Sequence, residues 1–330
     1  MDQSLPIIDV SDLRGSVAER RALGAQFVQT YGEVGFGYVI NHGVPQALVD
    51  SVFEQSRRFH ALPLDQKMAV ALDENHRGFI PINTSTDVTS TLATVTKANQ
   101  SESFMMMRES DADDPDVIAG AYLSGPNRWP SALPGFRETL ASYDAAMCAL
   151  AHSIVEVIAL ALGDEDRRLI ADFERPTTWL RLLHYPPQAP ASPDDLYGSA
   201  PHADFGCITL LAQDDVGGLE VRTMDGAWVA APPIEGSFVM NVGDMLHRWS
   251  NGLLASTPHR VINRSGRERY SVPFFYDPNV SADISPLPST IDADHPGAFE
   301  SLNFGEFLRS QLTASYVRHA PPAGLTNTAP

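Results

Sequence analysis

Two histidines and one aspartate have the side chains and the spacing of a metal site. His202 and Asp204 lie two residues apart in PHADFGCITL, and alternate residues of a strand project from the same face. Of the ten histidines, only His202 is followed two residues later by an acidic residue. His259 lies in a second strand-like segment, TPHRVIN, 259 − 204 = 55 residues after Asp204, which is far enough for antiparallel strands to return it to the pair. These three side chains could reach one metal ion.

This ligand set favours iron over zinc. Two histidines and one carboxylate form the facial triad that leaves positions open on iron(II), whereas zinc sites usually close around four ligands, or three and one water. Cys148 and Cys207 are too few for a thiolate cluster. Two alternatives remain from the residues alone: hydrogen-bonded core histidines with a turn aspartate, and a zinc hydrolase, for which no suitably placed general base is recognisable.

An arginine and a serine begin a later apolar strand, RYSVPFFYDP. Arg269 and Ser271 share one face of that strand by the same alternation. An inward arginine is costly unless it pairs with an anion, and a guanidinium can bind a carboxylate in bidentate fashion. A dicarboxylate that chelates iron at one end and meets Arg269 at the other would use all these groups. The alternative is a salt bridge to one of the 41 acidic residues.

The elements that must position these residues change character along the chain. Helical spacing predicts helices over 17–31, from Gln46 to the stop at Pro63, and over 136–162, while 77–96 reads as a long loop. After about residue 176, short apolar runs alternate with Gly, Pro, Asn and Asp. Short apolar segments separated by turn-forming residues are typical of an antiparallel sandwich or jelly roll. The expected fold is therefore mainly β with flanking helices.

Composition limits the class of protein. A chain of 330 residues that is 43% hydrophobic can bury a substantial core, so we expect one catalytic unit over 1–330. A basic leader and a stretch of about 18 apolar residues are both missing, and two cysteines suit a reducing compartment. We therefore expect a soluble, cytoplasmic protein with no membrane partner. The net charge of −18 argues against nucleic acid and favours a small-molecule substrate.

Taken in order and spacing, several motifs resemble the isopenicillin N synthase-like family of 2-oxoglutarate and iron(II)-dependent oxygenases. They are LPIIDVSDL, YGEVGFGYVINHGVP and RRFHALPLDQK, followed by LHYPP, HADFGCITLL, GGLEV, VMNVGDMLHRWSNG, STPHRVIN and RYSVPFFYDP. The family includes plant and microbial enzymes of secondary metabolism that modify flavonoids, alkaloids, gibberellins and antibiotics. The resemblance implies a double-stranded β-helix (jelly-roll) core over 176–285, preceded by a helical and mixed region over 1–130.

The resemblance also assigns roles to residues. It implies that His202, Asp204 and His259 bind iron(II), and that Arg269 and Ser271 bind the distal carboxylate of 2-oxoglutarate. Tyr185 in LHYPP matches a tyrosine that often joins that carboxylate. Oxygen would be the other co-substrate, succinate and carbon dioxide the co-products, and hydroxylation the default outcome.

Two departures and two rival functions accompany this resemblance. Leu183 and His184 stand where many plant members have Asn and Tyr. Isopenicillin N synthase and the ethylene-forming plant oxidase also carry an Arg-x-Ser element without consuming 2-oxoglutarate. The rivals are therefore an iron(II) oxidase of the same fold that does not use 2-oxoglutarate, and a non-catalytic binding module.

The candidate substrate contacts are Met105, Met107 and Phe275. Flexible thioethers and an aromatic ring suit an apolar or aromatic substrate, although core packing also explains them.

Overall fold

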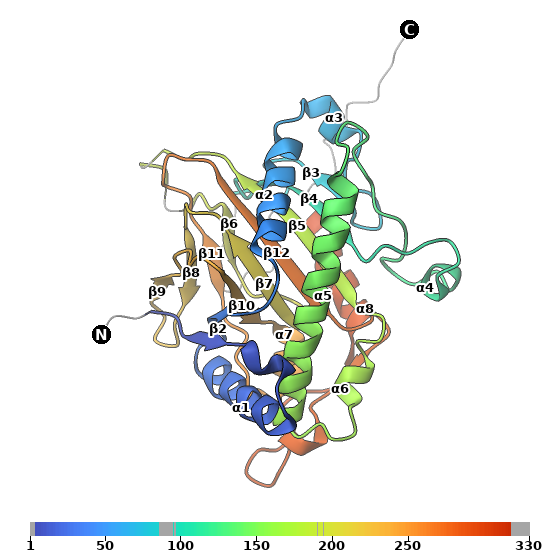
Figure 1. Cartoon of the computed structure of the whole chain (residues 1–330), viewed down its shortest axis with the longest axis vertical. Coiled ribbons are helices and arrows are strands. Elements are labelled where there is room, and N and C mark those ends of the chain that lie inside the picture. The colour runs from blue at the N-terminus through green and yellow to red at the C-terminus, as the bar shows by residue number, and fades with distance from the viewer. Residues whose placement is uncertain (1–3, 86–94, 96, 190, 194, 318–330) are drawn as a thin grey trace.

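A computed structural model gives the fold of the chain, and it describes residues 4–85, 95, 97–189, 191–193 and 195–317. The helices and strands are arranged as two facing β-sheets with helices outside them (Figure 1). Part of the segment that the sequence predicts as a loop, 86–94 and 96, lies outside the described residues. Within that same segment Gly78–Ile80 forms strand β3, so the loop prediction is wrong there. Three residues are too few to show a strand's alternation in the sequence.

The larger sheet has eight strands. Their order is β1 (Ile7–Asp9), β2 (Phe36–Ile40), β10 (Ser237–Val242), β7 (Ile208–Gln213), β12 (Arg269–Asp277), β5 (Thr177–Tyr185), β4 (Glu102–Met107) and β3 (Gly78–Ile80). Neighbours pair antiparallel, except β1 and β2, which are parallel. Strands from the first 130 residues therefore lie at both edges of a sheet whose centre comes from the later part of the chain.

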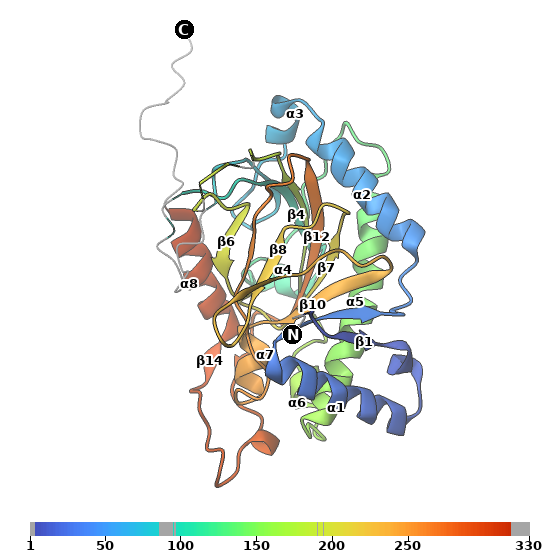
Figure 2. The ribbon, with the colours of Figure 1, turned by 90° about the vertical axis from the view of Figure 1, so that its left-hand side faces the viewer.

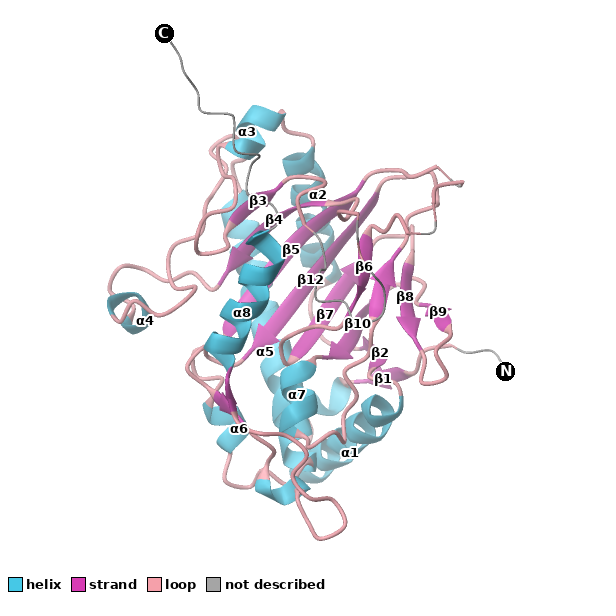
Figure 3. Ribbon diagram, turned by 180° about the vertical axis from the view of Figure 1, so that it is seen from behind, coloured by secondary structure: helices cyan, strands magenta, loops and turns pink. Residues whose placement is uncertain are grey.

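The smaller sheet faces the centre of the larger one. It has the order β6 (Ser199–His202), β11 (His259–Val261), β8 (Leu219–Arg222) and β9 (Trp228–Ala230), all antiparallel. A short pair, β13 (Asp283–Ile284) and β14 (Leu302–Asn303), lies apart from both sheets. The two facing sheets, seen from behind in Figure 3, are the expected jelly-roll core.

Helices cover the outer face of the larger sheet. Helices α1 (Val17–Glu33), α2 (Gln46–His60) and α5 (Phe136–Ala161) fall where the sequence predicts helices. Figure 2 shows α8 (Phe304–Val317) on the side opposite α2 and α5. The short helices are η1 (Ser11–Arg14), α3 (Leu64–Met68), α4 (Pro115–Ile118), α6 (Arg168–Ala171), α7 (Asp244–Trp249) and η2 (Pro288–Thr290).

Helix α5 is long and apolar enough to cross a membrane by length and composition alone, with a mean hydropathy of 1.6. In this structure it is a core helix. Ile154, Val157 and Ile158 are fully buried. A Cβ atom on Gly24 of α1 would lie 2.1 Å from the carbonyl oxygen of Val157, so the two helices need a glycine where they cross. Burial among other helices explains the hydropathy of α5.

Strand alternation separates two kinds of environment. On β5 and β12, Leu180, Leu182, Val272 and Phe274 belong to the main core shared with the helices. The intervening residues of the same strands point between the two sheets, where a smaller cluster of buried residues includes Leu183 and Tyr185. Residues of like parity along β5 and β12 therefore face the space between the sheets.

Candidate metal centre

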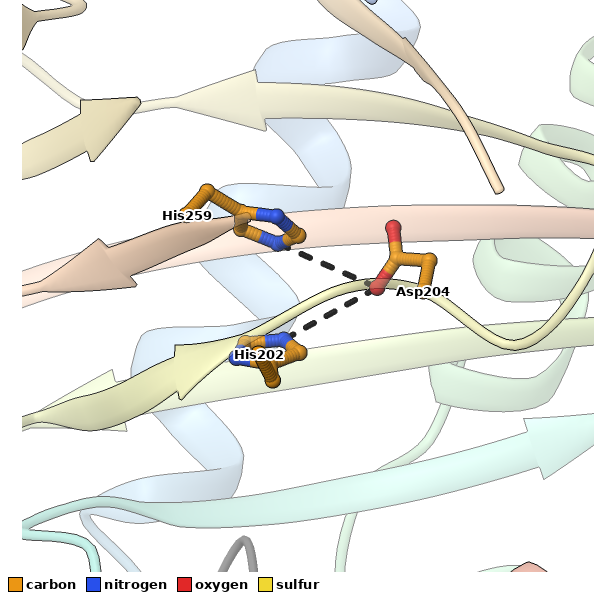
Figure 4. A group of neighbouring side chains, drawn as sticks. All are labelled: His202, Asp204 and His259. Carbon is orange, nitrogen blue, oxygen red and sulfur yellow. Dashed lines mark ion pairs between the residues drawn. The ribbon is translucent and has the colours of Figure 1, made fainter. Parts of the chain in front are cut away.

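The two histidines meet because β6 and β11 are paired. His259, the first residue of β11, lies directly opposite His202, the last residue of β6, and their ring centroids are 4.3 Å apart. The Nε2 atom of each ring lies 3.8 Å from Oδ1 of Asp204. One ligand atom from each of the three residues lies within 4.8 Å of the others (Figure 4). The three predicted ligands therefore converge on one point.

Asp204 reaches this point by a different route from the one that the sequence predicts. Strand β6 ends at His202, so Asp204 lies in the loop after it and strand alternation does not orient its side chain. Thr209 and Asn241, which are opposite each other on β7 and β10, hold it instead. The Thr209 hydroxyl and the Asn241 amide donate to Oδ2 at 2.5 and 2.7 Å, which leaves Oδ1 facing the histidines.

Hydrogen bonds also orient the imidazoles. Nδ1 of His202 lies 2.7 Å from the carbonyl oxygen of Ala200, and Nδ1 of His259 lies 3.4 Å from that of Thr257. Because a carbonyl only accepts, each Nδ1 carries the hydrogen and each Nε2 can offer its lone pair. This is the tautomer that a metal bound at Nε2 requires.

The carboxyl group of Asp204 is buried, and burial alone would raise its pKa. The two histidines and the hydrogen bonds from Thr209 and Asn241 outweigh burial, so the pKa of Asp204 lies below its ordinary value. The group is therefore a carboxylate at neutral pH. Two imidazoles and one carboxylate, gathered on one side of a cavity, fit the ligand set of iron(II).

A cavity of about 230 Å³ joins the three converging residues to Arg269. Its walls come from both sheets and from α8. They include the apolar residues Met105, Trp179, Leu183, Leu211, Leu219, Val261, Pro273, Phe275, Leu308 and Leu312, and the basic residue Arg181. Apolar walls with a few convergent polar groups are typical of a small-molecule site.

Arg269 is fully buried, and its described hydrogen-bond partners are neutral. Its Nε donates to the carbonyl oxygen of Gly217 at 2.5 Å, and Nη1 and Nη2 donate to Ser271 and Gln213 at 3.2 Å. Among the residues that the structure describes, no carboxylate forms an ion pair with it. The salt bridge that the sequence leaves open is therefore absent from this described environment, and the positive charge faces the cavity.

The remaining sequence candidates divide. Met105 and Phe275 line the cavity, and Tyr185 lines it with its ring 4.6 Å from the Arg269 guanidinium carbon. Met107 does not line it: its side chain borders a separate, smaller hollow, and Asn127 bonds both of its backbone polar groups. Met105 and Met107 share a face of β4, and Met107 pairs with Trp179, which does line the cavity, so neither face nor register places Met107 outside it.

Sequence reasoning did not single out Trp179, Arg181, Thr209, Gln213 or Asn241 as site residues. For Trp179 and Arg181 a signal was present, because both have the parity of Tyr185 along one strand. For Asn241 and Thr209 the signal is weaker, since their role depends on a loop conformation at Asp204.

Comparisons with known proteins agree with this geometry. The family model of the 2OG-Fe(II) oxygenase superfamily matches residues 176–278, and that of the N-terminal region of non-haem dioxygenases in morphine synthesis matches 5–132. The chain is 36% identical to the 2-oxoglutarate-Fe(II) type oxidoreductase hxnY of Emericella nidulans, over 95% of this chain and 90% of that protein. It is 32% identical to homoarginine-6-hydroxylase 2-ODD-C23 of Glycine max, over 95% and 98%. The crystal structure of a full-length Neurospora crassa protein in complex with alpha-KG and thymine aligns with a TM-score of 0.83 at 28% identity, over 94% and 97% of the two chains.

Proposed function

Because the chain belongs to the 2-oxoglutarate and iron(II)-dependent oxygenase superfamily, we propose that His202, Asp204 and His259 bind its iron and that Arg269 and Ser271 bind the distal carboxylate of its 2-oxoglutarate. The protein is a non-haem dioxygenase that uses iron(II), 2-oxoglutarate and oxygen to oxidise a small organic molecule. Hydroxylation is the outcome that we propose. The two rivals, an oxidase without 2-oxoglutarate and a non-catalytic module, do not fit relatives that are 2-oxoglutarate-dependent dioxygenases.

One observation carries the residue assignment. Arg269 is buried in the same cavity as the three converging side chains, and its described hydrogen-bond partners are neutral. A buried guanidinium is stabilised when an anion supplies the missing charge. A ligand with one carboxylate at Arg269 and a chelating group at the other end would span the cavity.

The residues of the chain then divide the work. When bound, iron(II) supplies the redox chemistry by which oxygen is activated and 2-oxoglutarate becomes succinate and carbon dioxide. His202, Asp204 and His259 hold one side of the metal position and leave the side toward the cavity open. Thr209 and Asn241 keep the carboxylate turned toward the histidines. Leu183, Leu211 and Pro273 line the path to Arg269 and exclude water from it.

We further propose that residues 1–330 act as a single catalytic unit, with 1–130 as its N-terminal region and 176–285 as its binding core. The support is that β2 pairs with β10 and β4 pairs with β5, so the N-terminal region completes the sheet on which the cavity lies. Separate expression of 176–285 should therefore give a protein that does not fold. A stable fragment that binds iron would contradict this division.

Location and pathway are also proposals. Two free cysteines are consistent with the cytoplasm, and the net charge of −18 argues against a nucleic-acid partner. The resemblance in motifs supports a role in secondary metabolism. Cell fractionation tests the location, and metabolite profiles of a deletion strain test the pathway.

Metal titration tests the ligand assignment. Iron(II) should bind the wild-type protein with a stoichiometry of one, and His202→Ala, Asp204→Ala and His259→Ala should each lose that binding. His295→Ala is a matched control, because the His295 side chain is 68% exposed. Undiminished iron binding in all three alanine variants would overturn the assignment.

A further inference from the structure

A second arginine of the cavity, Arg181, lies in the middle of β5. Its backbone pairs with Met105 of β4, and its Nε donates to the hydroxyl of Ser103 at 2.8 Å. The residue is partly buried and lines the cavity. Among the described residues, no carboxylate lies within the 4.0 Å that defines an ion pair with it.

The two guanidinium groups lie at different places along the cavity. Arg269 stands over Tyr185, and Arg181 comes four residues before Tyr185 on β5, on the same face of that strand. Four residues of a strand span about 13 Å, so the backbone of Arg181 lies well away from that of Tyr185. A ligand carboxylate held at Arg269 therefore leaves Arg181 for a second anionic group.

The charges near Arg181 favour an anion. Among the described residues, the acidic ones that line the cavity are Asp204 and Asp277. Asp204 is directed at the histidines, and Oδ1 of Asp277 accepts the backbone N–H of Cys207 at 2.7 Å. Neither balances Arg181. A partly desolvated guanidinium with one neutral partner gains from a bidentate carboxylate more than from a neutral acceptor.

The surroundings of Arg181 are otherwise apolar. Trp179 flanks Arg181 on β5, and Phe275 and Met105 line the cavity from the neighbouring strands. Two leucines of helix α8, Leu308 and Leu312, also line the cavity. A charged group among aromatic and aliphatic walls matches a ligand with one anionic end and an apolar body.

We propose that Arg181 binds the carboxylate of the primary substrate, an organic acid whose apolar body lies against Trp179, Phe275 and Met105. Ser103 is a positioning residue, because it fixes the Nε side of the guanidinium and leaves the Nη side for the ligand. The inference rests on the proposed function, since it assigns the space that remains once 2-oxoglutarate occupies the Arg269 end.

Calorimetric titration tests this proposal on the protein loaded anaerobically with iron(II) and saturated with 2-oxoglutarate. The probes are phenylacetate, 3-phenylpropanoate and 4-phenylbutyrate, each beside its primary amide, which keeps the shape and removes the charge. The best acid should bind about tenfold or more tightly than its amide. Arg181→Gln should remove that preference, Arg181→Lys should keep part of it, and Ser103→Ala should reduce it a few-fold.

The 2-oxoglutarate titration made on the same samples separates the two proposals. Failure of the wild-type protein to bind 2-oxoglutarate would count against the proposed function, and Arg181→Gln must bind it normally to show that the variant is folded. With 2-oxoglutarate bound, three results would overturn the role of Arg181: equal affinity for acid and amide, unchanged acid binding in Arg181→Gln, or no binding by any acid of the series.

Discussion

The guanidinium carbon of Arg269 lies 4.6 Å from the centre of the Tyr185 ring, in the cavity that the metal-site residues share. The ring supports the cation from one side while neutral acceptors hold its edges. The arrangement stabilises the positive charge without neutralising it, so the charge is available to a ligand carboxylate.

The ring of Tyr185, more than its hydroxyl, should matter for 2-oxoglutarate binding. Tyr185→Leu removes a desolvated cation–π contact and is expected to weaken 2-oxoglutarate binding by about tenfold. Tyr185→Phe keeps the ring and should change the dissociation constant less than about threefold. Equal losses in the two variants would instead assign the effect to the hydroxyl, the contact that the resemblance implies.

Asn241 should control iron affinity without touching the metal. Its amide donates to Asp204 Oδ2 at 2.7 Å, and removing such a partner of a metal ligand typically costs about 10- to 100-fold in affinity. Asn241→Leu should therefore bind iron(II) more weakly while keeping a cooperative unfolding transition. Asn303→Ala, on the half-buried strand β14 outside both large sheets, is the control. A folded Asn241→Leu protein with wild-type iron affinity would contradict this role.

Gly206 should resist substitution because the loop that carries Asp204 packs against β12. A Cβ atom there would lie 1.7 Å from Oδ1 of Asp277, which accepts the N–H of Cys207. Gly206→Ala is expected to lower the free energy of unfolding by about 1–3 kcal/mol and to weaken iron binding, because the loop must move. At Gly297 the nearest atom to an added Cβ is 3.5 Å away, so Gly297→Ala is the matched control. Denaturant titration and iron titration measure both effects, and equal behaviour of the two variants would refute the argument.

A buried histidine should make the protein less stable in mild acid. His60 of α2 lies beneath β5, and its Nδ1 donates to the carbonyl oxygen of Ser56 at 2.8 Å. Burial, with a smaller contribution from the neighbouring His184, lowers the pKa of His60 from 6.5 to about 3. In the unfolded chain, His60 therefore takes up a proton below about pH 6.5, whereas in the folded protein it stays neutral until about pH 3. Stability present above that window is lost as the pH falls through it.

From pH 7 to pH 5 this single site should cost about 2 kcal/mol of unfolding free energy. His60→Leu cannot take up the proton and should show a correspondingly smaller loss, whereas His295→Leu, at an exposed position, should behave like the wild type. Glu102 stays ionised in this range. Burial raises the pKa of Glu102, but hydrogen bonds from His184 and Lys67 outweigh burial and lower that pKa to about 2. Identical pH dependence in His60→Leu and wild type would rule out His60 as the cause.

The sequence predicts the parts of this fold whose information is local. The apolar spacing of 136–162 predicts α5 to within a residue at its C-terminal end, and strand parity correctly pairs Arg269 with Ser271. His202 and His259 lie side by side because of the register between β6 and β11. Their spacing in the sequence allows this register but does not fix it. Strand β4 escapes prediction for the same reason, because it acquires its partner β5 only in the assembled sheet.

The site itself shows where sequence reasoning ends. Asp204 lies beside His202 and His259 as predicted. Hydrogen bonds from Thr209 on β7 and Asn241 on β10 orient its side chain, and alternation with His202 along a strand does not. Met107 has the parity of Met105 and pairs with the cavity residue Trp179, yet it borders a separate hollow, so parity and register together do not define the cavity wall. Arg181 had the parity to be noticed, but its lack of a counter-ion among the described residues is visible only in three dimensions.

We propose that one cavity of this protein holds iron at His202, Asp204 and His259 and 2-oxoglutarate at Arg269. The most direct test is the visible charge-transfer absorption that appears when 2-oxoglutarate chelates iron(II), recorded without oxygen and without any substrate. We expect a band in the wild-type protein that is absent in His202→Ala. In Arg269→Ala the band should need roughly a hundredfold more 2-oxoglutarate, because a buried charge pair is lost. Iron binding without a band at saturating 2-oxoglutarate, or a band of equal affinity in Arg269→Ala, would contradict it.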